Sequence, residues 1–416
     1  MKQYLIKGGK KLCGRVKIES AKNSVLPILA ACALTDREVI IKNCPKISDV
    51  MGMLEILTFL GAKTEFWGDN LLVCCKDIKN KRIPCCLTGE LRSSVFMLGP
   101  LVARFNKAEL SLPGGCNIGS RPIDLHISGL ETLGAVSFCS VDGVFCDGSK
   151  MHPGTVKLKY PSVGATENIV MASVFLNGKT ILLNAAKEPE IVDLVMFLKK
   201  IGAKIVGEGT ERIEITGVNS LTGGEYLPFP DRIEAGTFAA LGLMCGGKID
   251  FENAGEENFS FFKNKFLNNS CKIYRSNDII TLIKIRRCTG FDLITAPYPG
   301  FPTDMQAQLL ALATVADGTS HITETVFESR FSHVKELIKT GAKISLKENT
   351  ATVTGVEELH GATLYAGDLR GGAALTLAAL TAKGESRIFG VEHIERGYLN
   401  FDKKLSSLGA EITVKK

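Results

Sequence analysis

The sequence predicts an α/β protein of two domains, in which each domain contains three copies of one repeat built around a buried helix. Three observations support this prediction. At 416 residues the chain is longer than one hydrophobic core usually organises. A helix that ends in Gly-Ala and runs into a strand recurs along the chain, and a short Ala-rich helix recurs at a similar spacing.

The chain is expected to begin with a hairpin, whose strands are residues 4–6 and 15–18 around Gly8-Gly9. No copy of the repeat precedes this hairpin, whereas the last copy stops after a single strand at residues 411–414. We therefore expect the N-terminal hairpin to complete the last repeat, which places the first residues of the chain in the second domain.

Each repeat then contains a short helix that is apolar on every side, as at residues 238–244. Such a helix is expected in a core, and none of the copies reaches the roughly 18 apolar residues of a membrane span. The six copies begin near Lys22, Arg92, Ala165, Glu234, Asp304 and Arg370, at steps of 70, 73, 69, 70 and 66 residues.

An amphipathic helix follows in each repeat, with a stripe such as Ile191, Leu194, Leu198 and Ile201. Glycine just beyond its last turn is typical of a helix C-cap. These cap positions are Gly61, Gly134, Gly202, Ser270 in a degenerate fourth copy, Gly341 and Gly409, at steps of 73, 68, 68, 71 and 68 residues.

Residues 221–230 are rich in glycine and proline and form a plausible linker between the third and fourth copies. The predicted domains are therefore residues 22–229 and residues 1–21 plus 230–416. In this arrangement the chain crosses between the domains twice.

Composition narrows the class of protein. The net charge of +6 is modest and its basic residues are spread out, which disfavours a nucleic-acid partner. There is no signal-like or membrane-spanning run, so we expect a cytoplasmic protein. We also expect it to be a monomer or weak oligomer. Thirteen cysteines suit a reducing compartment, and the vicinal pairs at 74–75 and 85–86 are expected in strands as small buried residues. The histidines show no metal-ligand spacing, and no metal is expected.

Residues 112–122 form a loop rich in glycine and proline. The loop presents Cys116, and its one charged residue is Arg121. A nearby cation stabilises a thiolate, so Cys116 is a candidate reactive residue. Lys22, Arg92, Asp304 and Arg370 each stand at the start of a buried helix, where free N–H groups favour anions. If these helix ends face each other across the domains, they line a cleft for an anionic ligand.

Longer motifs occur throughout the chain: Ala21-Lys22-Asn23-Ser24-Val25-Leu26-Pro27, residues 113–126, Ser162-Val163-Gly164-Ala165-Thr166, residues 301–308, residues 323–330 and Arg396-Gly397-Tyr398. Together they resemble the UDP-N-acetylglucosamine 1-carboxyvinyltransferases, members of the enolpyruvyl transferase family. The resemblance covers essentially the whole chain. It implies two domains of three βαβαββ units, each an inside-out α/β barrel with buried central helices, and an active site in the interdomain cleft.

The resemblance also implies the reaction, in which the enolpyruvyl group of phosphoenolpyruvate passes to the 3-hydroxyl of UDP-N-acetylglucosamine and phosphate is released, without a cofactor. This is the first committed step of peptidoglycan synthesis. Cys116 would be the acid or covalent residue and the target of fosfomycin, Asp304 the base, and Lys22 and Arg396 further catalytic residues. Among the residues implied to bind substrates, those matching phosphoenolpyruvate contacts are Lys22, Asn23, Arg121 and Arg396. Those matching contacts of the UDP-sugar are Arg92, Arg121, Pro122, Ile123, Asp124, Leu125, Ser162, Val163, Gly164, Asp304 and Val326, and Arg370 is a further substrate-binding residue.

Some positions depart from the family pattern or leave alternatives open. Glu19-Ser20 replaces a small pair, and Tyr160 stands where some members have a lysine near the uridine. Asp304 could instead be only a cap or first-turn residue of a helix, and His126 could be either a packed residue or a ligand contact. The alternative functions are the shikimate-pathway enolpyruvyl transferase and a non-catalytic paralogue that binds the UDP-sugar.

Overall fold

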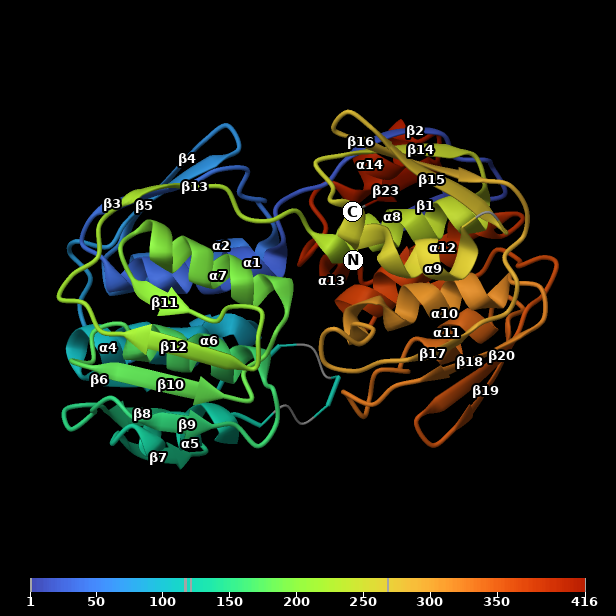
Figure 1. Cartoon of the computed structure of the whole chain (residues 1–416). Helices are drawn as coiled ribbons and strands as arrows, with labels where there is room; N and C mark the ends of the chain where they lie inside the picture. Colours follow the sequence, from blue (N-terminus) through green and yellow to red (C-terminus); the bar gives the residue numbers. More distant parts are fainter. Residues whose placement is uncertain (1, 116–117, 120–121, 268, 416) are drawn as a thin grey trace.

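Two separate hydrophobic cores organise the chain in the computed structural model, which describes residues 2–115, 118–119, 122–267 and 269–415. The first core collects buried residues from Val25 to Leu221, and the second collects Tyr4 to Ile18 together with Ile233 to Leu408. Figure 1 shows the two lobes side by side. We call them the first and second lobe; the domain limits given above remain a prediction.

Helices fill the inside of each lobe and sheets cover the outside (Figure 1), so the predicted inside-out α/β fold is confirmed. In α8, every residue from Ile233 to Met244 is buried. The central helices are α1 (Lys22–Ala31), α4 (Leu98–Phe105), α6 (Val163–Ser173), α8 (Arg232–Cys245), α10 (Gln306–Thr314) and α12 (Leu369–Thr381). Two of the predicted starts are 3-10 turns, because η2 (Arg92–Met97) precedes α4 and η4 (Thr303–Met305) precedes α10.

In the part of the chain that the structure describes, six sheets surround these helices, five of four strands and one of three. In the first lobe they are β13-β3-β5-β4 (Gly224–Tyr226, Glu38–Ile41, Asn70–Cys74, Lys63–Trp67), β6-β8-β7 (Lys107–Leu110, Gly143–Asp147, Val136–Ser140) and β11-β12-β10-β9 (Lys204–Val206, Arg212–Thr216, Lys179–Leu183, Thr155–Lys157). In the second lobe they are β15-β16-β14-β2 (Cys271–Ser276, Ile279–Lys284, Lys248–Glu252, Gly14–Lys17), β17-β18-β20-β19 (Asp292–Ile294, Thr319–Thr323, Thr350–Thr354, Lys343–Lys347) and β21-β22-β1-β23 (Thr363–Tyr365, Glu385–Phe389, Gln3–Lys7, Glu411–Lys415).

The predicted N-terminal hairpin is wrong, because its two strands belong to different sheets. Strand β1 pairs antiparallel with β22 and β23, whereas β2 pairs parallel with β14. The segment between them bonds to other loops, through Gly9 N to Leu380 O and Leu12 N to Gly246 O, so it runs from one sheet to the next instead of turning back. Strand β1 alone completes the last repeat, and β2 completes the fourth.

The amphipathic helices alternate with the strands as predicted. Gly61 follows α2 with φ of 114° and donates to Leu57 O, which is the left-handed C-cap that favours glycine. The helices of this group are α2 (Ser48–Leu60), α5 (Asp124–Thr132), α7 (Pro189–Lys200), α9 (Ser260–Phe266) after η3 (Glu256–Phe259), α11 (Val334–Ile338) and α14 (Phe401–Ser407). Shorter helices are η1 (Cys32–Leu34), α3 (Cys85–Thr88) and α13 (Val391–Glu395).

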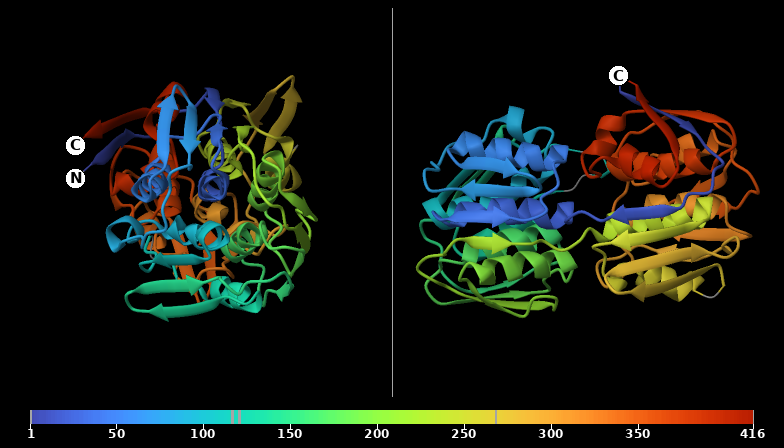
Figure 2. Two further views of the ribbon diagram at one scale, coloured as in Figure 1. Left: turned by 90° about the vertical axis from the view of Figure 1, so that its left-hand side faces the viewer. Right: turned by 90° about the horizontal axis from the view of Figure 1, so that it is seen from above.

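Two chain segments cross between the lobes side by side, as the view from above in Figure 2 shows. Ser20 and Pro230 form an antiparallel bridge between these segments. The departure at Glu19 has a local partner, because its carboxylate lies 3.0 Å from Lys404 Nζ, which also bonds Glu234 at 2.8 Å. This buried charge group fastens the crossing to α8 and α14.

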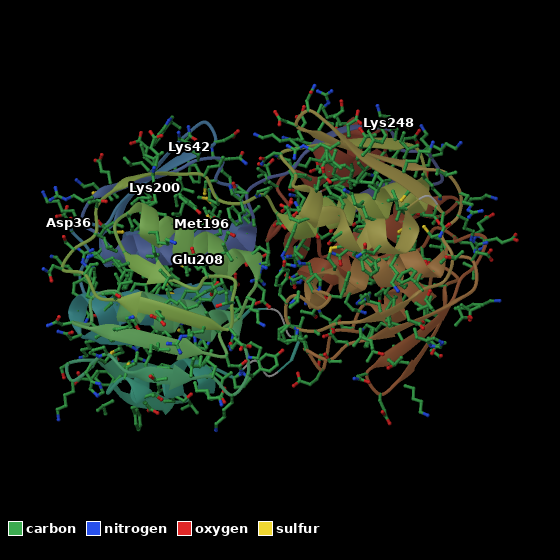
Figure 3. All side chains as sticks on the ribbon, in the orientation of Figure 1. Asp36, Lys42, Met196, Lys200, Glu208 and Lys248 are labelled. Carbon is green, nitrogen blue, oxygen red and sulfur yellow. The ribbon has the colours of Figure 1, made fainter. Side chains whose placement is uncertain are left out.

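The outer surface carries dispersed charges, for example Lys42, Lys200 and Lys248 (Figure 3). Among the described residues, no helix is long and apolar enough to cross a membrane. The expectation of buried vicinal cysteines fails for Cys85 and Cys86, which are exposed in α3. The reason is local, since Pro84 starts a helix here instead of ending a strand.

Candidate active site

Lys22 begins α1 at the boundary between the lobes. Its Nζ lies 2.7 Å from Asp49 Oδ2, and Asp49 Oδ1 lies 2.8 Å from Nε of Arg396 in the second lobe. Arg396 also donates to Glu90 O at 2.9 Å. Two cations predicted to bind phosphoenolpyruvate therefore meet at one carboxylate, that of Asp49. The sequence does not single out Asp49, because it resembles any acidic residue in the first turn of a helix.

The electrostatics of Asp49 follow from this pairing. Burial favours its neutral form, but the charges of Lys22 and Arg396 outweigh burial and hold the pKa of Asp49 below its usual range. The side chains of Lys22, Asp49 and Arg396 are 12 %, 9 % and 17 % exposed, so water screens the two ion pairs only partly.

Asp304 lies in a second cluster that also joins the lobes. Its Oδ1 is 2.5 Å from Arg330, its Oδ2 is 3.0 Å from Arg370, and Asn23 of the first lobe donates to Oδ2 at 3.3 Å. Asp304 is not the N-cap of η4, which is Pro302, but it lies in the first turn of this element, as one of the alternatives raised by the sequence allows. Arg330 ends the motif of residues 323–330, but the resemblance to the family implied no role for it.

Asp304 is the most strongly perturbed carboxyl of this site. Burial acts to raise its pKa, but the charges of Arg370 and Arg330 act against burial and, with Lys22, hold the pKa of Asp304 far below its usual range. A carboxylate held this strongly is a weak base. A bound anion that neutralised these arginines would make it a stronger base.

The candidate UDP-sugar residues in the first lobe gather at the start of α6. Ser162 Oγ accepts from Ala165 N at 3.4 Å, and Val163 and Gly164 form the first turn. A side chain at Gly164 would come within 2.9 Å of the His126 ring, so this turn packs closely against α5.

His126 itself is buried, with Nδ1 2.7 Å from Asn168 Nδ2. Burial, with the charge of Arg92, lowers the pKa of His126 to about 3, so its ring is neutral and accepts from the amide. This geometry favours packing over ligand contact for His126. Four residues predicted to contact the UDP-sugar lie just before or at the start of α5: Pro122, Ile123, Asp124 and Leu125. Of these, Pro122 and Asp124 are exposed.

The stem of the predicted catalytic loop packs against α3 and η2. Gly114 N donates to Thr88 O, and a side chain at Gly114 would fall 1.6 Å from Gly89 O, so only glycine fits. Arg92 donates to Pro113 O at 3.2 Å. Cys116 and Arg121 lie outside the described residues.

Beyond Cys116, the loop contacts the second lobe. Ser329 N donates to Ile118 O at 3.2 Å, and Gly119 faces the Glu328 carboxylate. Val326, another predicted sugar contact, donates its N–H to Glu324 at 2.8 Å. Glu324 also accepts from Thr303 of η4, which places the Val326 segment beside the element that carries Asp304.

The structure thus groups the predicted residues around two carboxylates. Lys22 and Arg396 contact Asp49. Asn23 and Arg370 contact Asp304. The lobes also meet at a second ion pair, where Arg232 binds Glu190 at 2.9 Å. The boundary thus holds cations from both lobes beside a half-buried carboxylate, a charge arrangement that suits an anionic ligand.

Comparison with known proteins shows the family to which the chain belongs. Residues 6–405 match the family model described as EPSP synthase (3-phosphoshikimate 1-carboxyvinyltransferase). The UDP-N-acetylglucosamine 1-carboxyvinyltransferase 2 of Caldanaerobacter subterraneus is 44 % identical over 413 residues, which are 99 % of both chains. The UDP-N-acetylglucosamine 1-carboxyvinyltransferase of Methylacidiphilum infernorum is 45 % identical over 416 residues, again 99 % of both.

Solved structures share the fold at lower identity. The enolpyruvyl transferase NikO from Streptomyces tendae matches with a TM-score of 0.89 and 24 % identity, over 100 % of this chain and 99 % of its own. An EPSP synthase from Acinetobacter baumannii matches with a TM-score of 0.77 and 16 % identity over the whole of both chains. At these identities the likeness concerns the fold alone.

Proposed function

Because the chain belongs to the EPSP synthase family, and its relatives at 44–45 % identity are UDP-N-acetylglucosamine 1-carboxyvinyltransferases, we propose that it is an enzyme of this activity. It transfers the enolpyruvyl group of phosphoenolpyruvate to the 3-hydroxyl of UDP-N-acetylglucosamine and releases phosphate, the first committed step of peptidoglycan synthesis. The observation that carries the proposal is the Asp304 cluster, in which a carboxylate, two arginines and Asn23 of the other lobe meet.

The charges of the site suit the substrates. Phosphoenolpyruvate carries a carboxylate and a phosphate, and arginine forks bind such groups at two points. Lys22 and Arg396 come from different lobes and already share the Asp49 carboxylate. We assign Lys22 and Arg396 to the binding of phosphoenolpyruvate. The substrate would then bind these two cations in place of Asp49 or together with it.

The reaction adds and then eliminates. A proton is added to the methylene carbon of phosphoenolpyruvate, while the sugar oxygen loses its proton and forms a bond to the adjacent carbon. The bond from that carbon to the phosphate oxygen then breaks, the methyl group loses a proton, and the double bond is restored. We assign the removal of the hydroxyl proton to Asp304 and the delivery of the carbon proton to Cys116.

The remaining assignments extend this scheme. Asn23, Arg92, Arg121, the residues 122–125, Ser162, Val163, Gly164, Val326 and Arg370 hold the two substrates. The loop that carries Cys116 reaches the second lobe at Ser329, so closure of the lobes would exclude water from phosphoenolpyruvate. We also propose that the protein works in the cytoplasm as a monomer or weak oligomer.

A coupled phosphate-release assay tests the activity. The purified chain is mixed with phosphoenolpyruvate and either UDP-N-acetylglucosamine or shikimate 3-phosphate, with a reaction lacking acceptor as the control. We expect phosphate only with the UDP-sugar. Release with shikimate 3-phosphate alone would favour the activity named in the family description, and release with neither acceptor would favour a non-catalytic binding protein.

A further inference from the structure

Tyr398 is a buried residue next to the site whose hydroxyl is held by two central helices of the second lobe. It is 1 % exposed, and its hydroxyl lies 2.8 Å from Thr237 Oγ1 of α8 and 3.2 Å from Gln308 Nε2 of α10. Gln308 also donates to Thr237 Oγ1 at 3.1 Å, so the three side chains form a closed network. Such a network fixes the tyrosine ring more firmly than packing alone.

The face of this ring supports the arginine that holds Asp304. The guanidinium carbon of Arg370 lies 5.5 Å from the centre of the Tyr398 ring, and Phe401 packs against the same ring at 4.8 Å. Arg370 then binds Asp304 Oδ2 at 3.0 Å. A guanidinium over a desolvated aromatic face is attracted to it, which limits the positions that Arg370 can adopt.

The backbone of Tyr398 also lies two residues beyond Arg396. Tyr398 N donates to Ile394 O at 3.1 Å and closes the turn after α13. A side chain at the intervening Gly397 would come within 2.6 Å of Leu369, the first residue of α12. The turn that presents Arg396 is therefore packed against the helix start that presents Arg370.

We propose that Tyr398 is a positioning residue for the reaction, which fixes Arg370 against Asp304 through its ring and fixes the turn of Arg396 through its backbone. The inference rests on the proposed function, because it concerns the geometry of the assigned base. Tyr398 touches no substrate in this scheme and acts only through Arg370 and Arg396.

The test replaces the ring while keeping the volume filled. Tyr398→Met removes the aromatic face, and Tyr398→Phe removes only the hydroxyl. Tyr4→Met is the matched control, because Tyr4 is also 1 % exposed in the second lobe and its hydroxyl has no hydrogen-bond partner among the described residues. Each variant is assayed for kcat, for the KM of both substrates, for the pH dependence of kcat and for thermal stability.

We expect kcat of Tyr398→Met to fall about 10- to 100-fold, as for other small displacements of catalytic groups, with a smaller change in the KM of UDP-N-acetylglucosamine. Asp304 faces Arg330, Arg370, Lys22 and Asn23. Because a looser Arg370 lowers the pKa of Asp304 less, the acidic limb of the kcat profile should move to higher pH. Tyr398→Phe should recover most of kcat and show a smaller shift in the same direction.

Two outcomes overturn the inference. In the first, Tyr398→Met loses stability as Tyr4→Met does but keeps the kcat and pH profile of that control. In the second, Tyr398→Met does not fold, and Tyr398→Phe, which keeps the aromatic face, loses as much kcat as predicted for loss of the ring and shows no shift of its pH profile. A failure of the proposed function looks different, because the wild-type chain itself would then show no turnover of UDP-N-acetylglucosamine with phosphoenolpyruvate.

Discussion

The two lobes share one repeat but differ in how their central helices begin. In the second lobe, Asp231 accepts from Ile233 N and Glu234 N at 2.8 and 2.9 Å, and Asp368 accepts two N–H groups at 3.1 and 3.0 Å. In the first lobe, α1 follows Ala21, which has no capping group, and Ser162 makes a single contact of 3.4 Å.

This difference decides how the N–H groups at the helix starts are satisfied. A carboxylate cap satisfies the N–H groups of a helix and opposes the positive end of its dipole. The start of α1 has no cap of its own, and its first N–H, that of Lys22, donates to the Asp231 carboxylate of the second lobe at 3.3 Å. The comparison therefore teaches that α8 and α12 of the second lobe carry carboxylate caps of their own, whereas α1 of the first lobe depends on a carboxylate from across the boundary.

The largest expected effect concerns the loop of the first lobe. Cys116→Asp should turn over substrate at a reduced rate and should resist inactivation by fosfomycin, because a carboxylic acid donates a proton but is not alkylated like a thiolate. The check is residual activity after incubation with fosfomycin. Inactivation of the variant at the wild-type rate would remove Cys116 from the scheme.

The next test removes the base of the second lobe. Asp304→Asn should lower kcat about 10²- to 10⁴-fold, as expected for loss of a general base. Asp368→Asn is the matched control, because asparagine caps a helix as well as aspartate does. Steady-state phosphate release measures both variants. Equal kcat values for Asp304→Asn and the control would mean that Asp304 is not the base.

The ion pairs that join the lobes give a smaller effect. Asp49→Asn leaves Lys22 and Arg396 facing each other as like charges, and it should lower the unfolding free energy by about 1–3 kcal/mol at pH 7, with partial screening by water. Because the folded pKa of Asp49 is depressed, its contribution is present above the unfolded value near 3.9 and fades as the pH falls below it.

Thermal unfolding at pH 7 and near pH 3 measures this dependence. The difference between wild type and Asp49→Asn should shrink on acidification. Asp36→Asn is the control, because Asp36 belongs to an exposed ion pair on the outer face of the first lobe (Figure 3). A difference that stays constant with pH would show that Asp49 stabilises the lobes by packing and not by charge.

The smallest effect tests the caps directly. Asp368→Ala should cost about 1–2 kcal/mol, because two N–H groups lose their acceptor, and Ser162→Ala should cost about 0.5 kcal/mol or less. Ser162→Ala should still raise the KM of the UDP-sugar. Equal losses of stability in the two variants would remove the contrast between the lobes.

Much of the architecture was predictable because repeats are written into the sequence. The Ala-rich helices and the Gly-capped amphipathic helices follow from local pattern, and Gly61 has the left-handed φ that its position required. The hairpin prediction failed because the sequence shows where β1 and β2 are but not which strands they pair with. Asp49 was missed for a similar reason, since its partner Arg396 is 347 residues away.

The sequence by itself determined the repeat, the buried helices and the family to which the motifs belong, because these depend on spacing along the chain. Only the tertiary structure decided that Asp49 joins Lys22 to Arg396, that Asp304 faces two arginines, and that Tyr398 lies under Arg370. The physical reason is that charge pairs and ring contacts depend on distance in space, and folding brings together groups from opposite ends of the chain.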